Sequence, residues 1–438
     1  MTKNQRLSGM KEFINWQITQ VRKGGFPVLM NKIKRIFIEI IWFPLYLLAI
    51  IPVTVIRLIH PWVLIRIGAL IGTRIGHFAA NTELYLCERD AYINVPNQRH
   101  IDIFFIGYRP VCNHQLFTMW RRSLRIWSCW WILWPILRIN RIIPGGSFHE
   151  VGLNSQHDRD VHNLLDRSPQ HLQFTAEESF RGKAALKRMG IPENSEYVCL
   201  TVRDSAYLES QHKNSDYSYH NYRDSDINNY VLAAESLADQ GYFIIRMGAK
   251  VHRAMKCSHP KVIDYATNGM RTDFMDIYLG ATCAFCISVG TGFDAIPLIF
   301  RRPIVYVNMV PVGYFFTFCQ RFIGIFKHHL DSESNRELSL SEIVHRGVFY
   351  SMYSSVYQSN GVQLMENTPE EIRDVCVEMA EGLRGNSFTN EEDEVLQQRF
   401  WEIFPTDALD EYSGNPLHGE IRARCGTSFL RNNPEWLQ

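Results

Sequence analysis

The chain has 438 residues, of which 46% are hydrophobic and 21% charged, so it is long enough for two domains of about 100–200 residues each. A formal net charge of +1 gives no electrostatic case for nucleic-acid binding. The ten cysteines are spread along the whole chain, which is typical of reduced thiols and not of a disulfide framework. Cys283 and Cys286 form a lone CxxC without a second pair at metal-ligand spacing, so we interpret them as buried structural thiols.

The amino terminus combines basic residues with a long apolar run. Residues 1–35 contain eight Lys or Arg and a single acidic residue. Residues 36–56, IFIEIIWFPLYLLAIIPVTVI, carry one charge and are long enough to span about 30 Å of hydrocarbon. Pro44 and Pro52 divide this run, so two interpretations stay open: a kinked or re-entrant membrane anchor, and a buried helical hairpin. The basic residues beside it favour an anionic membrane surface as a partner.

The rest of the first half shows three patterns. Residues 72–86, GTRIGHFAANTELYL, place His77 after a glycine turn, where an imidazole is a candidate general base; a structural histidine is the alternative. Residues 101–107 predict a strand. Residues 121–141 hold four tryptophans at helical spacing and predict one helix, either a core helix or a membrane-interface belt and lipid-acceptor groove.

The second half alternates short apolar strands with helices. Strands are predicted at 197–202, 242–248, 262–265, 284–289 and 303–308, and helices from 227, over 273–281 and over 368–383. The last helix begins with a capping pattern, Thr368 and Glu371. Such alternation predicts a parallel sheet covered by helices on both faces.

A glycine loop follows the fourth of these strands, in SVGTGFDAIP at 288–297. Gly290 and Gly292 lack Cβ and allow a phosphate to approach the backbone closely, while Ser288 and Thr291 add hydroxyl donors. In an open α/β sheet ligands bind beyond the carboxyl ends of the strands, where this loop lies. A tight structural turn is the alternative.

Other strands bring further polar groups to the same predicted rim. Arg203 follows the first strand, Arg246 and Gly248 end the second, and Asp264 and Tyr265 end the third. Arginines suit the charge of a diphosphate, glycine permits close approach, and an acidic side chain suits a ribose. The set predicts a nucleotide diphosphate site.

Two local patterns are interpreted as helix starts. Asp224 and Asp226 form a DxD, which is a divalent-ion motif in some sugar transferases, but the position of Asp226 favours an N-cap for the helix from Ile227. Pro297 places the start of the helix behind the glycine loop near Ala295.

Taken in order, several short motifs resemble a family of bacterial GT-B-type glycosyltransferases linked to surface polysaccharide synthesis. They are Arg-Ile-Gly-His at 74–77 with Asn81 and Glu83, Arg-Asp-Ser at 203–205, Tyr-Arg-Asp at 222–224, Ile-Arg-Met-Gly at 245–248, Val-Ile-Asp-Tyr at 262–265 and Ser-Val-Gly-Thr-Gly at 288–292. The resemblance covers roughly 60–420. It implies an α/β, GT-B-like fold in which two Rossmann-like domains face a cleft, here with an N-terminal apolar, membrane-associating helical segment.

The family implies transfer of a sugar from a nucleotide-sugar donor to a glycan or lipid-linked acceptor, without an essential metal or a separate cofactor. His77 would deprotonate the acceptor, with Glu83 as its orienter or substitute. The donor would be held by Arg203, Arg246, Gly248, Asp264, Tyr265, Ser288, Gly290, Thr291 and Gly292. The enzyme would work at the cytoplasmic face of the inner membrane.

The expected organisation is a basic and apolar membrane-associating segment at 1–60, an acceptor domain at 61–185, a nucleotide-sugar domain at 186–390 and a helical tail at 391–438. Two other functions stay open. One is a sugar-nucleotide epimerase of the same architecture. The other is a non-catalytic, membrane-anchored module that binds a nucleotide-sugar or a glycan.

Overall fold

The computed structural model describes residues 3–152, 159–206, 218–386, 390–410 and 414–438. The chain forms two compact units that interleave along the sequence. The first holds residues 1–68, 96–108 and 127–151, and the second holds residues 69–95, 109–126 and 152–438. The contiguous domain boundaries expected from the sequence stay predictions.

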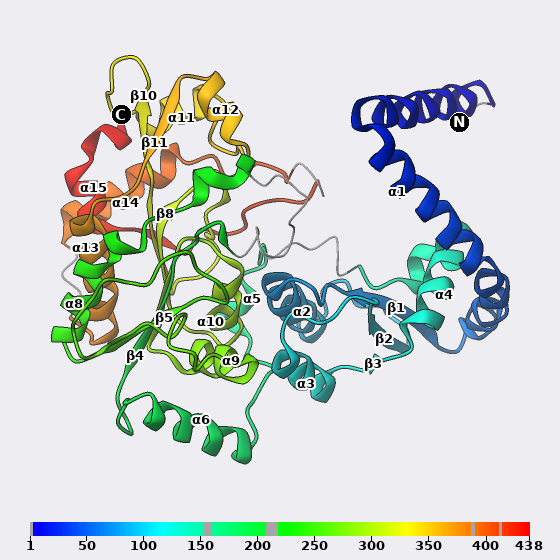
Figure 1. Ribbon diagram of the computed structural model, residues 1–438, viewed down its shortest axis with the longest axis horizontal. Helices are drawn as coiled ribbons and strands as arrows, with labels where there is room; N and C mark the ends of the chain where they lie inside the picture. The colour runs from blue at the N-terminus through cyan, green and yellow to red at the C-terminus, as the bar shows by residue number, and fades with distance from the viewer. Residues whose placement is uncertain (1–2, 153–158, 207–217, 387–389, 411–413) are drawn as a thin grey trace. The chain divides into compact units, whose positions relative to one another are not determined.

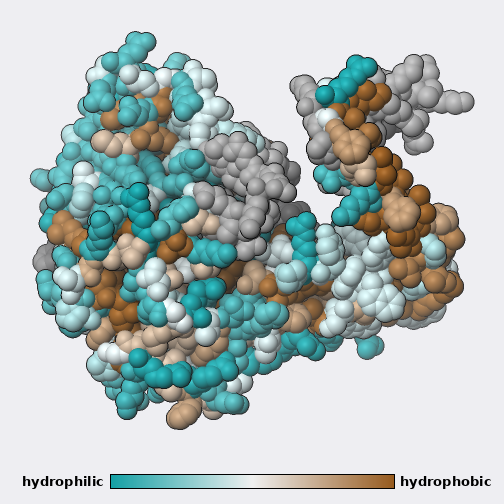
Figure 2. All heavy atoms as spheres, in the orientation of Figure 1, coloured by the Kyte–Doolittle hydropathy of each residue, from teal (hydrophilic) through white to brown (hydrophobic). Residues whose placement is uncertain are grey.

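The first unit begins with α1, Lys3–Ile59, which is interrupted at Gly25, where φ is 62° (Figure 1). Its part Val28–Ile59 is long and apolar enough, by length and composition, to cross a membrane. Most of its large apolar side chains are exposed, and Figure 2 shows them gathered along the helix. They include Ile36, Phe37, Ile40, Phe43, Leu48 and Ile51. The prediction of an apolar N-terminal helical segment is confirmed.

α4, Trp130–Ile142, packs against α1. The rings of Trp42 and Trp130 lie 5.5 Å apart, and the Arg57 guanidinium donates to Asn140 Oδ1 at 2.9 Å. Therefore one side of α1 is buried by protein and the other is left uncovered by the described part of this unit.

The single helix predicted over 121–141 is wrong. The chain instead forms α3, β3 and α4, whose bounds are His114–Ser123, Ile126–Trp127 and Trp130–Ile142. Leu124 leaves the helical conformation, with φ −128° and ψ 150°, and Ile126 then pairs as a strand. A short apolar stretch is compatible with a helix or a strand, and its tertiary contacts determine which one forms. Here the pairing of β3 in the sheet replaces the helix that the spacing of the tryptophans predicted.

Most of a three-stranded sheet of order β1-β2-β3 belongs to the first unit as well. β1 is Leu64–Leu70 and β2 is His100–Ile106, which confirms the strand predicted at 101–107. Arg66 and Asp102 form a buried two-bond ion pair between these strands, at 2.7 and 2.6 Å. A short 3-10 helix, η1, Gly146–His149, follows α4.

The second unit is built on a seven-stranded sheet of order β12-β9-β8-β7-β4-β5-β6, and all of its neighbouring strands are parallel. The strands are β4 Tyr197–Thr201, β5 Phe243–Met247, β6 Val262–Ile263, β7 Phe285–Ser288, β8 Ile304–Met309, β9 Phe322–Phe326 and β12 Arg424–Cys425. The parallel α/β sheet predicted from the sequence is confirmed. An antiparallel pair, β10 His328–Asp331 and β11 Val362–Met365, follows β9.

Helices in the second unit connect and cover these strands. The α-helices are α2 Ile75–Asp90, α3, α5 Leu164–Arg167, α6 Ala176–Arg188, α8 Val231–Asp239, α9 Asp273–Thr282, α10 Ala295–Ile299, α11 Leu340–His345, α12 Ser354–Ser359, α13 Pro369–Leu383, α14 Glu391–Ile403 and α15 Thr427–Asn432. The 3-10 helices are η2 Ser218–Arg223, η3 Ile227–Tyr230, η4 Gly292–Asp294, η5 Val312–Tyr314 and η6 Pro434–Leu437. α8 packs with α13, and α9 packs with α10, which in turn lies against α2.

The predicted local signals hold. Thr368 and Glu371 form a reciprocal capping box at the start of α13. The Asp226 side chain accepts from the Asn228 amide, so its role as an N-cap is confirmed. Cys283 and Cys286 are buried in the core, and α10 begins at Ala295 as expected.

Candidate anion site at the strand ends

The sheet of the second unit changes direction between β4 and β7. From β4 the chain adds β5 and β6 on one side, and from β7 it adds β8 and β9 on the other. Ligands of open α/β sheets bind at this switch point, outside the carboxyl ends of the strands. Arg203 follows β4 there, and the glycine loop follows β7.

Ser288 fixes the glycine loop from within. Its buried hydroxyl donates to Asp294 Oδ2 at 2.8 Å and accepts from the amides of Gly290, at 3.1 Å, and Thr291, at 3.4 Å. Gly290 has a left-handed φ of 72°, which favours glycine. Two of the amides expected to bind phosphate therefore donate to Ser288 in this structure, and the phosphate-binding role of the loop stays a prediction.

The amino-terminal end of α2 lies against this loop. A Cβ added to Gly76 would come within 3.2 Å of Gly292 Cα. The first turn of α2 contains no acidic residue, and Arg74 stands at its N-cap position. Because the first amides of a helix have no carbonyl partner within it, this end carries partial positive charge and favours an anion.

His77 lies in the same first turn, half-buried, with Nδ1 3.4 Å from Asn81 Oδ1. The structure therefore places the candidate base on the helix that contacts the glycine loop. Its role as a general base stays a prediction.

Four cationic side chains converge beside the loop, which we call the basic cluster: Arg74, Arg203, Arg223 and Lys327. Arg223 donates to the Gly290 carbonyl oxygen. Lys327, at the end of β9, donates to the Asp224 carbonyl oxygen at 2.6 Å, and the Asp224 carboxylate pairs with Arg203 at 3.1 Å. Among the described residues, neither Arg74 nor Arg223 forms an ion pair with a carboxylate, and Asp224 pairs directly with Arg203 alone, so the cluster has more cations than directly paired carboxylates.

The pKa directions of two groups at the basic cluster agree with this excess of positive charge. Burial, and then the positive charges of Arg203, Arg223 and Arg74, lower the pKa of His220 to about 4. Burial and then Arg223 lower the pKa of Arg203 from its ordinary value. The arrangement favours a bound anion, since a negative charge would relieve the repulsion among these cations.

A second group of predicted site residues forms hydrogen bonds within the loops that follow β5 and β6. It comprises Arg246, Asp264 and Tyr265. Arg246 is 2% exposed and donates to the Arg253 carbonyl at 2.6 Å and to Asp264 Oδ2 at 3.1 Å. Tyr265 is buried and its hydroxyl accepts from the Thr272 amide at 2.9 Å. These contacts tie Arg246 and Tyr265 to the loops of the rim, and their predicted role in holding the donor stays a prediction.

Gly248 follows β5 on the same flank as Arg246. A Cβ added there would come within 2.7 Å of Val251 Cγ1, so the absence of a side chain is explained by loop packing. One oxygen of the neighbouring carboxylate, Asp264 Oδ1, is buried and has no hydrogen-bond partner among the described residues. Asp264 therefore has one oxygen that can accept a hydrogen bond from a ligand. At Gly248, by contrast, the packing of the loop is enough to explain why the residue is glycine.

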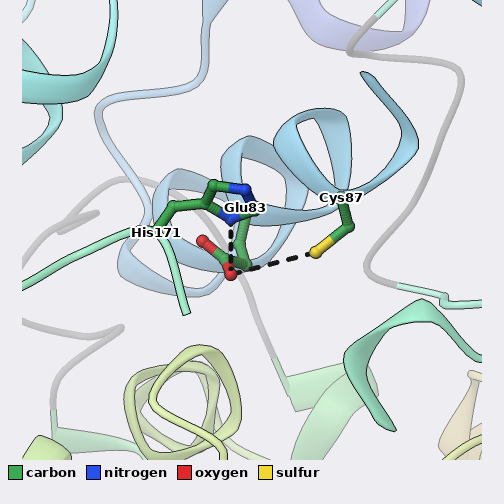
Figure 3. Close-up of side chains that lie close together, drawn as sticks. All are labelled: Glu83, Cys87 and His171. Carbon is green, nitrogen blue, oxygen red and sulfur yellow. Dashed lines mark hydrogen bonds and ion pairs between the residues drawn. The ribbon is translucent and has the colours of Figure 1, made fainter. Parts of the chain in front are cut away.

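Glu83 belongs to a buried ion-pair network and not to the His77 side of α2. Figure 3 shows its carboxylate directed at His171, and the Oε1–Nδ1 distance is 3.0 Å. Arg301 also donates to Glu83 Oε1, at 2.6 Å, and approaches Cys87 Sγ at 3.5 Å. The expectation that Glu83 orients His77 is therefore corrected: the hydrogen bonds of its carboxylate go to these three residues.

Glu83, Cys87 and His171 also present three potential metal ligands within 4.8 Å of one another. A metal ion here would have to displace the Arg301 guanidinium, which already supplies the positive charge. Although burial opposes protonation, hydrogen bonds to Cys87, Glu83 and Asp90 raise the pKa of His171 to about 10, so its ring is a cation as well. The donor set fits an ion-pair network better than a metal centre.

Four residues of this site were not predicted from the sequence: Arg74, His220, Arg223 and Lys327. Arg74 and Arg223 lie inside the quoted motifs, but nothing in the spacing shows that their side chains converge. Lys327 directly follows β9, a strand that was not predicted, so recognition of FIGIF at 322–326 as a strand would have placed it at the rim.

No protein-family model matches the sequence, and no curated protein matches it significantly. Among solved structures, the chain is similar to the glycosyl transferase family 9 protein from Veillonella parvula DSM 2008, with 11% identity and a TM-score of 0.43 over 74% of this chain and 98% of that one. It is also similar to the E. coli ADP-heptose lps heptosyltransferase II, with 12% identity and a TM-score of 0.35 over 68% of this chain and 97% of that one. The iron-containing dodecameric glycosyltransferase TibC from enterotoxigenic E. coli H10407 matches with 10% identity and a TM-score of 0.29, over 56% and 59% of the two chains. These likenesses are distant, so the case for a function rests on the residues of this chain.

Proposed function

We propose that the protein is a glycosyltransferase that moves a sugar from a nucleotide-sugar donor to a glycan or lipid-linked acceptor in surface polysaccharide synthesis. The observation that carries the proposal is the basic cluster at the switch point of the parallel sheet, with the start of α2 beside it. A diphosphate matches both its charge and its place in the fold. The motif resemblance supplies the reaction class.

In the proposed reaction an acceptor hydroxyl attacks the anomeric carbon of the donor. The bond from that carbon to the diphosphate oxygen breaks, and its electron pair leaves with the nucleoside diphosphate. Arg203 and Arg223 stabilise the charge that develops on this leaving group, because their hydrogen bonds to Asp224 and Gly290 fix them in place before the reaction. The exposed Arg74 adds its positive charge nearby. His77 takes the proton of the acceptor hydroxyl.

The first test is a thermal-shift screen of the full chain against inorganic pyrophosphate, nucleoside diphosphates and sugar nucleotides. A ligand present at about 100 times its Kd stabilises the fold by about 2.7 kcal/mol, so a matching nucleotide raises the Tm clearly. The best sugar nucleotide is then incubated with candidate acceptors, and release of nucleoside diphosphate is measured.

Three outcomes contradict the proposal in different ways. Binding without turnover, whatever the acceptor, points to the binding module. Acceptor-independent change of the sugar configuration points to the epimerase. If neither pyrophosphate nor any nucleotide binds, the basic cluster is not an anion site.

We further propose that α1 associates the protein with the cytoplasmic face of the inner membrane. Its exposed apolar side chains support this, as do the basic residues in the first part of the same helix. Apolar area of this kind is stabilised by transfer into hydrocarbon at about 25 cal/mol per Å².

We expect the protein to stay with sedimented membranes in high salt and to be released by detergent. The double change Leu48→Asp and Ile51→Asp, at side chains 61% and 65% exposed, should move it to the soluble fraction, because two carboxylates oppose insertion. Val395→Asp, at an equally exposed apolar position on α14, is the matched control and should leave the distribution unchanged. Full release of the unmodified protein by salt alone would contradict insertion.

A further inference from the structure

The second half of α1 has two different faces. One face lies against protein, with Ala49 and Val53 only 4% and 1% exposed. The other face is apolar and open, and its side chains recur every three or four residues, which is the spacing of one side of an α-helix. Each of the following is at least half exposed: Phe37, Ile41, Leu48, Ile51, Val55 and Leu58. The apolar run is therefore divided between a face packed on protein and a face that is left open.

The segment around α4 holds the packed face of α1 from Glu39 to Arg57 (Figure 1). Glu39 pairs with Arg138 of α4 at 3.5 Å, and Arg57 donates to the Pro144 carbonyl oxygen at 2.9 Å. The single charge within the apolar run is thus paired with α4. At a rise of about 1.5 Å per residue this stretch of helix is about 27 Å long, close to the thickness of the hydrocarbon core of a bilayer, about 30 Å.

The same packing brings strands of the three-stranded sheet beside α1. The ring of Trp130 lies 5.5 Å from that of Trp42 and 5.8 Å from that of Tyr108, which follows β2. β3 ends shortly before Trp130. If residues 36–56 crossed the hydrocarbon with this packing kept, these strand ends would enter it too. Strand edges and loops have no hydrogen-bond partners in lipid, so the packing of α1 on α4 is incompatible with a helix that spans the bilayer.

Basic residues stand on both sides of the apolar run in the sequence. Lys32, Lys34 and Arg35 precede it, and Arg57 follows it. Lys and Arg favour the cytoplasmic side of a membrane and are attracted to anionic lipid. Because both flanks are basic, we expect both ends of the run on the same side, facing an anionic lipid surface.

α4 adds exposed apolar side chains next to its contact with α1. Trp131 and Ile132 directly follow Trp130, and they are 50% and 41% exposed. Tryptophan is enriched where hydrocarbon meets water, because its ring is amphipathic. The open apolar surface of the first unit is therefore made by two helices and not by α1 alone.

We propose that α1 and α4 form a monotopic face, which inserts into one leaflet of an anionic bilayer without crossing it. The open face of α1 and Trp131 contact the acyl chains, whereas Glu39, Arg138 and Arg57 stay at the level of the headgroups. Both termini then lie on the same side of the membrane. This inference rests on the membrane association in the proposed function, to which it adds the topology and a second inserted helix.

The first experiment locates both ends of the full chain in a bacterial host. An epitope tag is placed at each terminus, and protease is added to spheroplasts and to inside-out membrane vesicles. We expect immunoblots to show that both tags are protected in spheroplasts and that both are digested in inside-out vesicles. Digestion of the two tags from opposite sides would show that α1 crosses the membrane, and it would overturn the inference.

The second experiment measures the contribution of α4, by flotation of the purified full chain with vesicles of phosphatidylcholine and phosphatidylglycerol. Trp131→Ala should weaken binding by about tenfold, which corresponds to about 1.4 kcal/mol, near the lower end for burial of a large apolar side chain. Phe180→Ala, at a 76% exposed position on α6, is the matched control and should leave binding unchanged. A spanning α1 would leave α4 in water, so unchanged binding of Trp131→Ala would contradict a monotopic face.

The third experiment tests the charge of the lipid. Lys34 is exposed, and Lys34→Gln should weaken binding to the vesicles with phosphatidylglycerol by about fivefold, the effect of about 1 kcal/mol for one basic residue near an anionic surface. Binding to vesicles of phosphatidylcholine alone should be weaker and insensitive to this change. Equal binding of the unmodified chain to both kinds of vesicle would contradict an anionic leaflet as the partner.

Two further outcomes separate this inference from the proposed function. If the chain stays with native membranes but binds no lipid vesicle, a membrane protein covers this face, and the inference is overturned while the membrane association stands. If the chain is absent from native membranes, the proposed membrane association fails together with the inference. Sugar transfer is independent of both results, because the nucleotide assays measure it directly.

Discussion

Replacing Arg223 with methionine should lower kcat/KM for sugar transfer by about 100-fold or more, the usual effect of removing one preorganised stabiliser of transition-state charge. Methionine keeps much of the length of the side chain but removes the guanidinium that donates to the Gly290 carbonyl. The variant therefore loses a cation of the basic cluster and a contact that holds the glycine loop. Initial rates at several donor concentrations give the effect on kcat and KM separately.

The pKa of His220 shows whether the Arg223 charge has been removed from the basic cluster, and it can be measured without any substrate. Burial is the main reason that the pKa of His220 falls to about 4, and Arg223 contributes to the remainder. Removing Arg223 should therefore raise the pKa of His220, which an NMR titration of the imidazole reports. Arg399→Met, at an exposed arginine on α14, is the matched control and should change neither quantity. Full activity of Arg223→Met would remove Arg223 from the proposed site.

Glu83→Gln should destabilise the fold by about 3–5 kcal/mol, because it removes the shared counter-charge of Arg301 and His171, whose side chains are only 14% and 12% exposed. Glu83 is fully buried in this network, whereas Glu394, paired with Arg424 on the surface, is 54% exposed. Glu394→Gln is therefore the matched control, with an expected loss of about 0–1 kcal/mol. Urea unfolding followed by circular dichroism measures both losses.

The difference in stability between the unmodified chain and Glu83→Gln should also depend on pH, in a direction that the pKa of His171 fixes. Against the burial that opposes protonation, hydrogen bonds raise the pKa of folded His171 from 6.5 to about 10. The folded state then holds a proton that the unfolded state has lost between these two pH values, so this contribution is complete below pH 6.5 and disappears as pH rises toward 10. The stability gap between the unmodified chain and Glu83→Gln should shrink over that window. A gap that stays constant would show that His171 is not charged by Glu83.

The sheet of the second unit was predictable because its strands are short apolar runs between clear turn signals. The order Tyr197–Thr201, Phe243–Met247, Phe285–Ser288 and Ile304–Met309 follows from that pattern. By contrast, β12 has only two residues, Arg424 and Cys425, and its pairing with β9 depends on a long-range contact that no local pattern records.

The site was only partly predictable, for a related reason. Placing Arg203 and the glycine loop at one rim needs only strand order, and the structure brings them together. The sequence does not show which arginine is paired with a carboxylate, because that depends on contacts between distant residues. Arg246 is neutralised by Asp264. Arg223, in contrast, reaches the glycine loop from a 3-10 helix, which leaves no periodic pattern in the sequence. Glu83 illustrates the same limit, because its partners His171 and Arg301 lie 88 and 218 residues away in sequence.

The contact between Gly76 and Gly292 is backbone against backbone, at 3.2 Å from the built Cβ position to Gly292 Cα. Ile75 Cγ2 lies beside this contact, 3.4 Å from a Cβ built on Gly292, so the two segments have little space in which to shift independently. A shift of the glycine loop as a leaving group departs must therefore be passed to the first turn of α2, which carries His77. In the proposed reaction, this contact would keep the helical turn that carries His77 next to the loop beside the leaving group.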